Sequence, residues 1–346
     1  MQQWIKEVAR GKRGAKDLSY EQAKLAAETL FSREATDVQI AAFLIAERIK
    51  TETPDELLAI TEAMRAGAAV LQLPSDVRNS VIDFAGPYTG RQSFLATIPV
   101  SILLAESGIP AFLHSSDALP PKYAISIKAV LDKLGVKTDS SPEQTAKTVS
   151  ELNIGFASAE IFWQPFSRFR TIRDDIGVRT VLNTAEKLLN YAGAANIMMG
   201  AFHRTAIQNI YPVFEKLRYE QAFIVQGAEG SEDVPVHRNS FVFTISGSDM
   251  SSFILKPEDY GLKADESAFD KTLTAESQAK KITALLSGNE DPSLDYERKQ
   301  VLMNAALRYY LFGHTASIEE GAELAKSQLR QKRGLRTLER WISGSY

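Results

Sequence analysis

The residues best suited to chemistry in this 346-residue sequence gather in two glycine-containing stretches. The first, A-G-P-Y-T-G-R-Q-S at residues 85–93, follows a short apolar run, and its backbone N–H groups could surround a phosphate where a helix begins. The plain alternative is an ordinary strand-to-helix connection. The candidate phosphate-binding residues are Gly86, Tyr88, Thr89, Gly90, Arg91, Ser93 and Thr97.

The second stretch, G-A-E-G-S-E-D at residues 227–233, carries three carboxylates on a glycine-rich turn. Carboxylate oxygens in such a turn suit Mg²⁺, particularly Mg²⁺ shared with the phosphates of a substrate. Glu232 and Asp233 are the candidate metal ligands. The alternative is an acidic loop that binds no metal.

Arginine and histidine side chains add a candidate site for an acceptor molecule. Arg173 and Arg179 precede a predicted helix with Asn183 in its first turn, and arginine holds a carboxylate or phosphate through two parallel hydrogen bonds. A surface ion pair between Arg173 and a neighbouring aspartate is the alternative. His114 ends a predicted strand at the same sheet edge as residues 85–93, and it either orients a ligand or caps the strand.

The composition excludes several classes of function. The sequence has no cysteine, so it has no disulfide, thiolate nucleophile or cysteine metal site, and a reducing cytoplasm is the expected location. No apolar stretch reaches the ~20 residues that span a bilayer, and the N-terminus lacks the pattern of a secretory signal. No G-x-S-x-G elbow, no intact phosphate-binding G-x-x-x-x-G-K-[ST] loop and no pair of histidines at metal-ligand spacing occurs.

Basic residues cluster at both ends and in the middle of the chain, although the net charge is only −3. Such clusters are either solvated helix faces or contacts to an anionic partner such as single-stranded nucleic acid. Phe169 or Trp341, if exposed, could stack on bases. The candidate nucleic-acid contacts are Lys6, Arg10, Lys12, Arg13, Arg168, Arg170, Lys332, Arg333 and Arg336.

The pattern of apolar residues predicts a small helical N-terminal domain over residues 1–72. Capping boxes begin two helices, at Ser19 and Thr53, and Thr36 can cap a third helix between them. Ile40 and Phe43, on the helix after Thr36, either form an exposed dimer surface or pack within the chain.

Residues 73–346 are predicted to form an α/β domain with a mainly parallel central sheet, because short apolar runs alternate with helical patterns. Strands are expected at residues 81–84, 111–113, 154–156, 197–200, 222–226 and 241–245. Helices are expected at 123–134, 142–152, 180–189 and 205–217 and through much of the chain from residue 277 onward.

Over nearly its whole length the sequence resembles the anthranilate phosphoribosyltransferase family, on the motifs A-A-F-L-I-A-E-R-I-K-T-E-T-P-D-E-L, I-G-V-R-T-V-L-N, V-Q-G-A-E-G-S-E-D and N-A-A-L-R-Y-Y-L-F-G. The resemblance implies a helical domain joined to a large α/β domain and a homodimer formed through the helical part. It also implies Mg²⁺-dependent transfer of ribosyl phosphate from phosphoribosyl pyrophosphate to the amine of anthranilate.

The motifs of the active family members are altered in this chain. Their G-T-G-G-D loop aligns with residues 85–89, where Pro87 and Tyr88 replace glycines, and of their K-H-G-N-R stretch only His114 remains. By the resemblance, Arg173 contacts anthranilate, and the metal pair written D-E appears in reversed order as Glu232 and Asp233. These departures, together with the basic N-terminus, resemble a divergent branch, the YbiB-like proteins, which are associated with binding single-stranded nucleic acid.

Two hypotheses follow from these observations. In the first, the protein is a homodimer that binds phosphate-rich ligands such as single-stranded nucleic acid and is not an efficient anthranilate phosphoribosyltransferase. In the second, it is an active Mg²⁺-dependent phosphoribosyltransferase that acts on anthranilate or another aromatic acceptor. The altered loop favours the first hypothesis, and the retained acidic pair favours the second.

Overall fold

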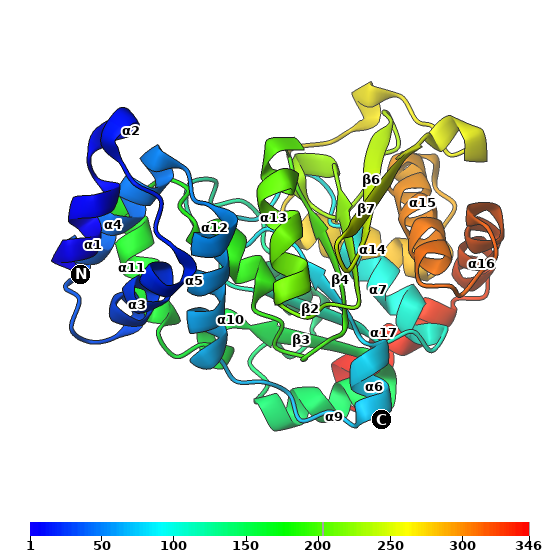
Figure 1. The fold of residues 1–346 in the computed structure, drawn as a ribbon. Helices are drawn as coiled ribbons and strands as arrows, with labels where there is room; N and C mark the ends of the chain where they lie inside the picture. Colours follow the sequence, from blue (N-terminus) through cyan, green and yellow to red (C-terminus); the bar gives the residue numbers. More distant parts are fainter. Residues whose placement is uncertain (203, 346) are drawn as a thin grey trace.

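The computed structural model describes residues 1–202 and 204–345, without the side chains of Lys12, Arg204 and Thr205. Its N-terminal part is a bundle of helices, coloured blue at the left of Figure 1. The capping boxes predicted at Ser19 and Thr53 are formed, and Thr36 caps its helix as expected, in a capping box with Gln39, so three of these helices begin where the sequence indicates. The bundle consists of α1 (Gln2–Val8), α2 (Gly11–Gly14), α3 (Tyr20–Phe31), α4 (Asp37–Lys50) and α5 (Pro54–Ala66).

A seven-stranded sheet forms the centre of the rest of the chain, in the order β3-β2-β1-β4-β5-β6-β7. The five strands from β3 to β5 are parallel, and β6 and β7 form an antiparallel hairpin at one edge. The mainly parallel sheet predicted from the sequence is therefore confirmed. The strands are β1 (Ile82–Ala85), β2 (Ala111–Ser115), β3 (Ile154–Ser158), β4 (Asn196–Gly200), β5 (Gln221–Val225), β6 (Ser240–Ser246) and β7 (Asp249–Leu255).

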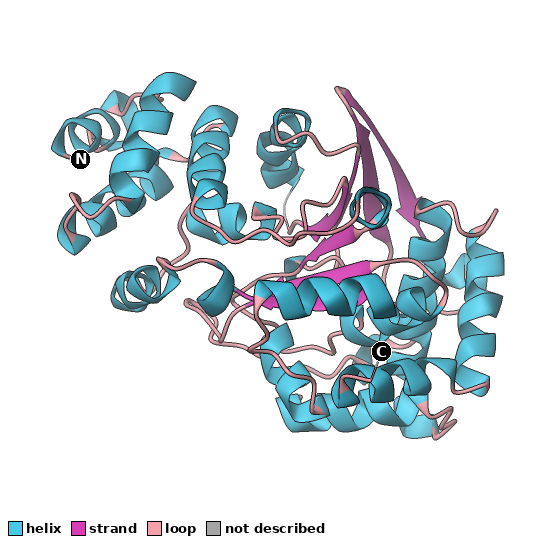
Figure 2. Ribbon diagram, turned by 90° about the horizontal axis from the view of Figure 1, so that it is seen from below, coloured by secondary structure: helices cyan, strands magenta, loops and turns pink. Residues whose placement is uncertain are grey.

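Helices cover both faces of the sheet, as Figure 2 shows. Alternate residues of a strand point to opposite faces, so Ile197 and Met199 of β4 join one hydrophobic core while Met198 joins the other. The first core also contains the buried residues of the N-terminal bundle. Its other helices are α9 (Pro142–Leu152), α10 (Ala159–Phe162), α11 (Phe166–Ile176), α12 (Leu182–Ala185) and α13 (Arg204–Lys216).

The second core lies under the C-terminal helices, of which α15 and α17 pack against α7. Because the first core is shared, the N-terminal bundle is joined to the sheet through α11, α12 and α13, which contact α4 and α5. The remaining helices are α6 (Ser75–Ser80), α7 (Thr97–Glu106), α8 (Ile127–Leu134), α14 (Ala275–Leu286), α15 (Asp295–Leu311), α16 (Ile318–Arg330) and α17 (Arg333–Ser343).

Several elements differ from the sequence-based expectation. The helix expected from residue 123 begins at Ile127, because Ser126 caps it and Tyr123 has a left-handed backbone with φ of 46°. The helix expected at 180–189 is divided into α12 and a 3₁₀ turn. Strand β7 and helix α11 were not predicted. Ile40 and Phe43 are buried within the chain and form no exposed surface.

Among the residues that the structure describes, no helix is both long enough and apolar enough to cross a membrane.

Candidate functional site

The order of the strands indicates where a ligand would bind. The chain adds β2 and β3 on one side of β1, and β4 and β5 on the other side, so the order reverses between β1 and β4. In open α/β sheets, ligands bind beyond the carboxyl ends of the strands at such a reversal. A cavity of about 420 Å³ lies at this position, between Pro87 after β1 and Gly200 at the end of β4. Hereafter we call it the switch-point cavity.

Glycine is required at residue 200, because a Cβ atom there would lie 2.0 Å from the backbone carbon of Ser231. The close approach brings the turn at residues 227–233 against β4. The acidic turn and residues 85–97 consequently meet at the carboxyl edge of the sheet.

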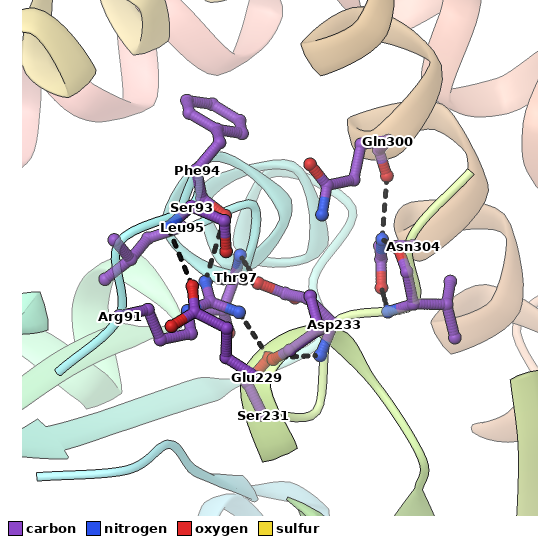
Figure 3. Close-up of polar contacts among 12 residues, drawn as sticks. Arg91, Ser93, Phe94, Leu95, Thr97, Glu229, Ser231, Asp233, Gln300 and Asn304 are labelled. Atoms are coloured by element: carbon purple, nitrogen blue, oxygen red, sulfur yellow. Dashed lines mark hydrogen bonds and ion pairs between the residues drawn. The ribbon is translucent and has the colours of Figure 1, made fainter. Parts of the chain in front are cut away.

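Asp233 is enclosed by two buried arginines, of which Figure 3 shows Arg91. Arg91 donates to Oδ2 at 2.7 Å, Arg308 of α15 donates to Oδ1 at 2.8 Å, and the backbone N–H of Thr97 donates to Oδ2 at 2.9 Å. Burial opposes ionisation, but the two guanidinium charges hold the pKa of Asp233 below its usual range. Both carboxylate oxygens are therefore occupied by protein donors.

Arg91 is directed into the protein rather than towards a ligand. It also donates to the hydroxyl of Ser231, and its side chain is 2% exposed. The other arginine, Arg308, lies over the ring of Phe84 at 4.7 Å from its centroid. This buried group of Asp233, Arg91 and Arg308 connects the loop, the acidic turn and α15.

Glu229 occupies two further donors of the loop. Its Oε1 accepts from the backbone N–H groups of Gln92 at 2.9 Å and Ser93 at 2.8 Å, and its Oε2 lies 3.2 Å from Lys122 Nζ. Burial opposes ionisation here too, yet the bonds to Ser93 and the charge of Lys122 lower the pKa of Glu229. A carboxylate of the protein thus lies where the sequence suggests a phosphate.

The rest of the loop is held by the segment before α8. Arg91 N–H donates to Ile125 O, and Ala124 N–H donates to Thr89 O. A Cβ on Gly90 would lie 2.4 Å from Ala124 O, so only glycine allows this contact. The space left among Gly86, Thr97, Glu232 and their neighbours measures about 10 Å³, which holds at most one water molecule.

His114 and Tyr88 form a buried pair. The Tyr88 hydroxyl lies 2.6 Å from His114 Nδ1, and His114 Nε2 lies 3.1 Å from Oδ1 of Asp83. All three side chains are fully buried. They connect β1, β2 and the loop, and none of them lines the switch-point cavity. A ligand-binding role for Tyr88 and His114 stays a prediction.

Arg173 does not pair with a neighbouring aspartate. It makes two hydrogen bonds to Glu186, at 2.5 and 3.3 Å, and is 4% exposed. Asn183 lines the switch-point cavity, and its Oδ1 accepts from Thr180 N–H at 2.9 Å. Of the acceptor-like residues, Asn183 alone lines the cavity, and the guanidinium of Arg173 is already paired with a carboxylate.

The side chains at the predicted metal site do not fit Mg²⁺. Asp233 is fully paired with arginine, and Glu232 is the other member of the predicted pair. Glu232 is fully buried, and neither of its carboxylate oxygens has a hydrogen-bond partner among the described residues. Within residues 1–202 and 204–345, no three His, Cys, Asp or Glu side chains form a group that could hold a metal ion.

Sequence reasoning missed three residues of this site. Lys122 and Lys187 line the switch-point cavity with Arg179, and Arg308 pairs with Asp233. A charged residue next to apolar ones in a helical pattern was the available signal for two of them, since Arg308 follows the mostly apolar residues 301–307 of α15 and Lys187 precedes Leu188 and Leu189. Lys122 carried no such signal.

The predicted nucleic-acid contacts do not share one surface of the chain. Figure 1 places α1 and α17 at opposite ends of the molecule. Arg10, Arg168, Arg170 and Arg333 pair with acidic side chains. Lys6, Arg13, Lys332 and Arg336 form no ion pair with a described residue and are exposed. The side chain of Lys12 lies outside the described part.

The expectation that Phe169 or Trp341 could stack on bases was wrong. Phe169 is 2% exposed and packs against Trp163 and Phe31, and Trp341 is 7% exposed. Neither ring is available to a base.

The fold and the cavity define an α/β protein with an N-terminal helical bundle and a ligand site at the switch point of the sheet. Two family models match the chain, the helical bundle domain of a glycosyl transferase family over residues 2–68 and the a/b domain of a glycosyl transferase family over residues 90–333. The chain therefore belongs to the anthranilate phosphoribosyltransferase-like glycosyl transferase family.

Individual relatives agree with this assignment. The anthranilate phosphoribosyltransferase of Persephonella marina is 29% identical, with 97% of each chain covered, and that of Methanosarcina acetivorans is 30% identical, with 95% and 85% covered. The crystal structure of the enzyme from Thermus thermophilus matches with a TM-score of 0.82 at 26% identity, covering 98% of each chain. The Saccharomyces cerevisiae enzyme in complex with PRPP and Mg has the same fold, with a TM-score of 0.83, 19% identity and 99% and 96% covered.

Proposed function

We propose that this protein binds phosphate-rich ligands such as single-stranded nucleic acid and is not an efficient anthranilate phosphoribosyltransferase, as in the YbiB-like branch that its sequence resembles. One observation carries the proposal: side chains of the protein occupy the groups that the two substrates would need. Glu229 accepts from the loop N–H groups, Glu186 pairs with Arg173, and two arginines enclose Asp233.

The pairing of Arg173 with Glu186 argues specifically against anthranilate. A carboxylate substrate would have to displace Glu186 from a buried two-bond pair, and breaking such a pair costs about 3–5 kcal/mol. That cost equals roughly a 10²–10⁴-fold loss of affinity. Anthranilate is consequently a poor acceptor for this site.

A strip of cations supports the binding of phosphates. Arg48 of α4 donates to the backbone oxygen of Arg179 at 2.5 Å, and Arg179 and Lys187 line the switch-point cavity. None of the three forms an ion pair with a described residue. The strip runs from the helical bundle to the carboxyl edge of the sheet, so a phosphate backbone lying along it would be neutralised by several cations.

A titration with an unphosphorylated single-stranded oligonucleotide at two salt concentrations tests this proposal. We expect the affinity to fall with salt at a log–log slope of roughly −0.7 for each phosphate contacted. Arg179→Gln should weaken binding and reduce that slope. Lys263→Gln, at an exposed lysine paired with Glu258 and outside the candidate contacts, is the matched control and should do neither. A flat salt response would refute nucleic-acid binding, and an equal loss in Lys263→Gln would refute the location.

A Mg²⁺-dependent phosphoribosyltransferase acting on another aromatic acceptor is the second candidate. It is favoured by the two carboxylate oxygens of Glu232, which are buried without a partner beside Gly86, and by the relative in complex with PRPP and Mg. The pairing of Asp233 with Arg91 and Arg308 speaks against it. Phosphoribosyl pyrophosphate binding that requires Mg²⁺ and is lost in Glu232→Gln would establish this candidate in place of the first.

We further propose that the protein is a cytoplasmic homodimer whose N-terminal domain, residues 1–72, forms the contact, with residues 73–346 as the second domain. The absence of cysteine supports the location. Support for the dimer comes from α4, where Val38 and Ile49 are 79% and 60% exposed, with Ile45 between them on the same face.

A further inference from the structure

Lys187 is a buried cation that forms no ion pair with a described residue. It is 5% exposed, and its Nζ donates to the backbone oxygens of Gly200 at 3.0 Å and Gly230 at 3.4 Å. No carboxylate of the described residues lies within ion-pair distance of it. An ammonium group has three donors and is costly to bury unpaired. One donor of Lys187 therefore remains for an anion in the switch-point cavity that this residue lines.

The cavity around Lys187 is lined by both cationic and apolar side chains. Arg179 and Lys122 are cationic, and the guanidinium of Arg179 makes no hydrogen bond with the described residues. Met199 and, from α13, Ile210 are apolar. At about 420 Å³ the cavity falls in the range of sites for small organic ligands and is too large for an anion alone.

The local charges leave the cavity positive. Lys122 is paired with Glu229, so its charge is compensated. Lys187 and Arg179 then remain against the carboxylate of Glu232, which acts on Lys187 and has no hydrogen-bond partner among the described residues; Glu186, which also acts on Lys187, is paired with Arg173. A phosphomonoester carries about −1.5 to −2 charge at pH 7 and three terminal oxygens, so it suits the two cations Lys187 and Arg179 better than a carboxylate with a single negative charge.

We propose that the switch-point cavity binds a phosphomonoester that carries an aromatic ring system and has the size of one nucleotide. Lys187 and Arg179 would bind its phosphate, and Met199 and Ile210 would contact its aromatic ring. The inference rests on the proposed function and deepens it, because such a group occurs both in a free mononucleotide and at the 5′-phosphorylated end of a single strand. Polar contacts fix the orientation of the ligand, and the apolar side chains supply buried area.

The charge of Lys187 gives this site a characteristic pH dependence. Burial and the charges of Arg179 and Lys122 lower the pKa of Lys187 to about 8, against the opposing pull of Glu232 and Glu186. The second ionisation of a phosphomonoester lies near pH ~6. Binding through Lys187 is consequently strongest between these values and weakens as the pH rises from 7 to 9.

Calorimetric titration of the full chain with adenosine 5′-monophosphate tests the proposal, with adenosine and inorganic phosphate as partial ligands. We expect the monophosphate to bind more tightly than either part. Lys187→Met keeps the length of the side chain and removes the charge, so it should weaken binding at least about tenfold and abolish the decline between pH 7 and 9. Lys216→Met, at a surface lysine paired with Asp55, is the matched control and should leave both unchanged.

A second pair of titrations separates the two sources of the phosphate, using one oligonucleotide with and without a 5′-phosphate. If the phosphorylated strand binds more tightly than the unphosphorylated one, and Lys187→Met removes this difference, the cavity binds the end of a strand. If the mononucleotide binds but the two strands bind equally, the cavity binds a free nucleotide. Failure of the monophosphate to bind, or equal affinity in Lys187→Met, overturns this inference. Salt-sensitive binding of the unphosphorylated strand would then still stand, so the proposed function fails only if that binding is absent as well.

Discussion

Replacing Asp233 by asparagine tests whether this carboxylate stabilises the fold or binds a metal ion. The substitution preserves the size of the side chain and removes the negative charge that faces Arg91 and Arg308, both of which are at most 2% exposed. Two buried guanidinium groups would then lack their counter-ion. Removing one partner of a buried ion pair costs about 3–5 kcal/mol, so in a chain of 346 residues we expect the melting temperature to fall by roughly 4–7 °C.

The neighbouring Glu232 provides the matched control. Its carboxylate is buried and accepts no hydrogen bond from a described residue, so Glu232→Gln removes an uncompensated charge. We expect this variant to be at least as stable as the wild type. Asp233→Asn and Glu232→Gln, at two adjacent carboxylates of one turn, are thus predicted to have different effects on stability.

Thermal unfolding followed by circular dichroism, with Mg²⁺ and with a chelator, measures both effects. The expected result is a destabilised Asp233→Asn protein, an undiminished Glu232→Gln protein, and no effect of Mg²⁺ on any of them. A stable Asp233→Asn variant would refute the reasoning. So would a wild-type melting temperature that Mg²⁺ raises and that Asp233→Asn no longer responds to, because Asp233 would then be a metal ligand.

Three further predictions concern other parts of the chain. Burial, reinforced by the charge of Glu56, raises the pKa of Glu47 from about 4.5 to about 8. The free energy of unfolding should therefore fall as the pH rises between these values. Urea midpoints at pH 6 and 9 should show this decline, and Glu47→Gln should remove most of it. A double-mutant cycle of Arg173→Gln and Glu186→Gln should give a coupling energy of about 0.5–3 kcal/mol, whereas additive effects would mean that the pair contributes nothing. Val38→Glu, at a position 79% exposed, should convert a dimer to a monomer in sedimentation velocity without lowering stability, and an unchanged dimer would place the contact elsewhere.

Local signals in the sequence predicted most of the fold. The capping box of Ser141 with Gln144 gave α9 with its observed bounds, and the expected strands match β1 to β6 within two residues. β7 was missed because its outward residues are mostly polar and its pattern is not that of a buried strand. The bend before α8 was missed because it depends on the contacts of the loop with residues 124–125, far along the chain.

Local signals in the sequence could not predict which charged groups of the site are paired with one another. Arg91 and Asp233 lie 142 residues apart, and Glu229 lies 136 residues from Ser93. Residue types alone indicate which groups can bind a phosphate or a metal. Whether those groups are already paired with one another depends on tertiary packing, which brings carboxylates and cations of the same edge of the sheet into contact.

The most direct test of the account is a turnover assay that follows the fluorescence of anthranilate in the presence of phosphoribosyl pyrophosphate and Mg²⁺. Because Glu186 holds Arg173 and Glu229 holds the N–H groups of the loop, we predict no consumption of anthranilate above the protein-free background. Steady consumption that disappears in Glu232→Gln would contradict the account, since it would mean that the substrates displace these side chains and that the site is catalytic.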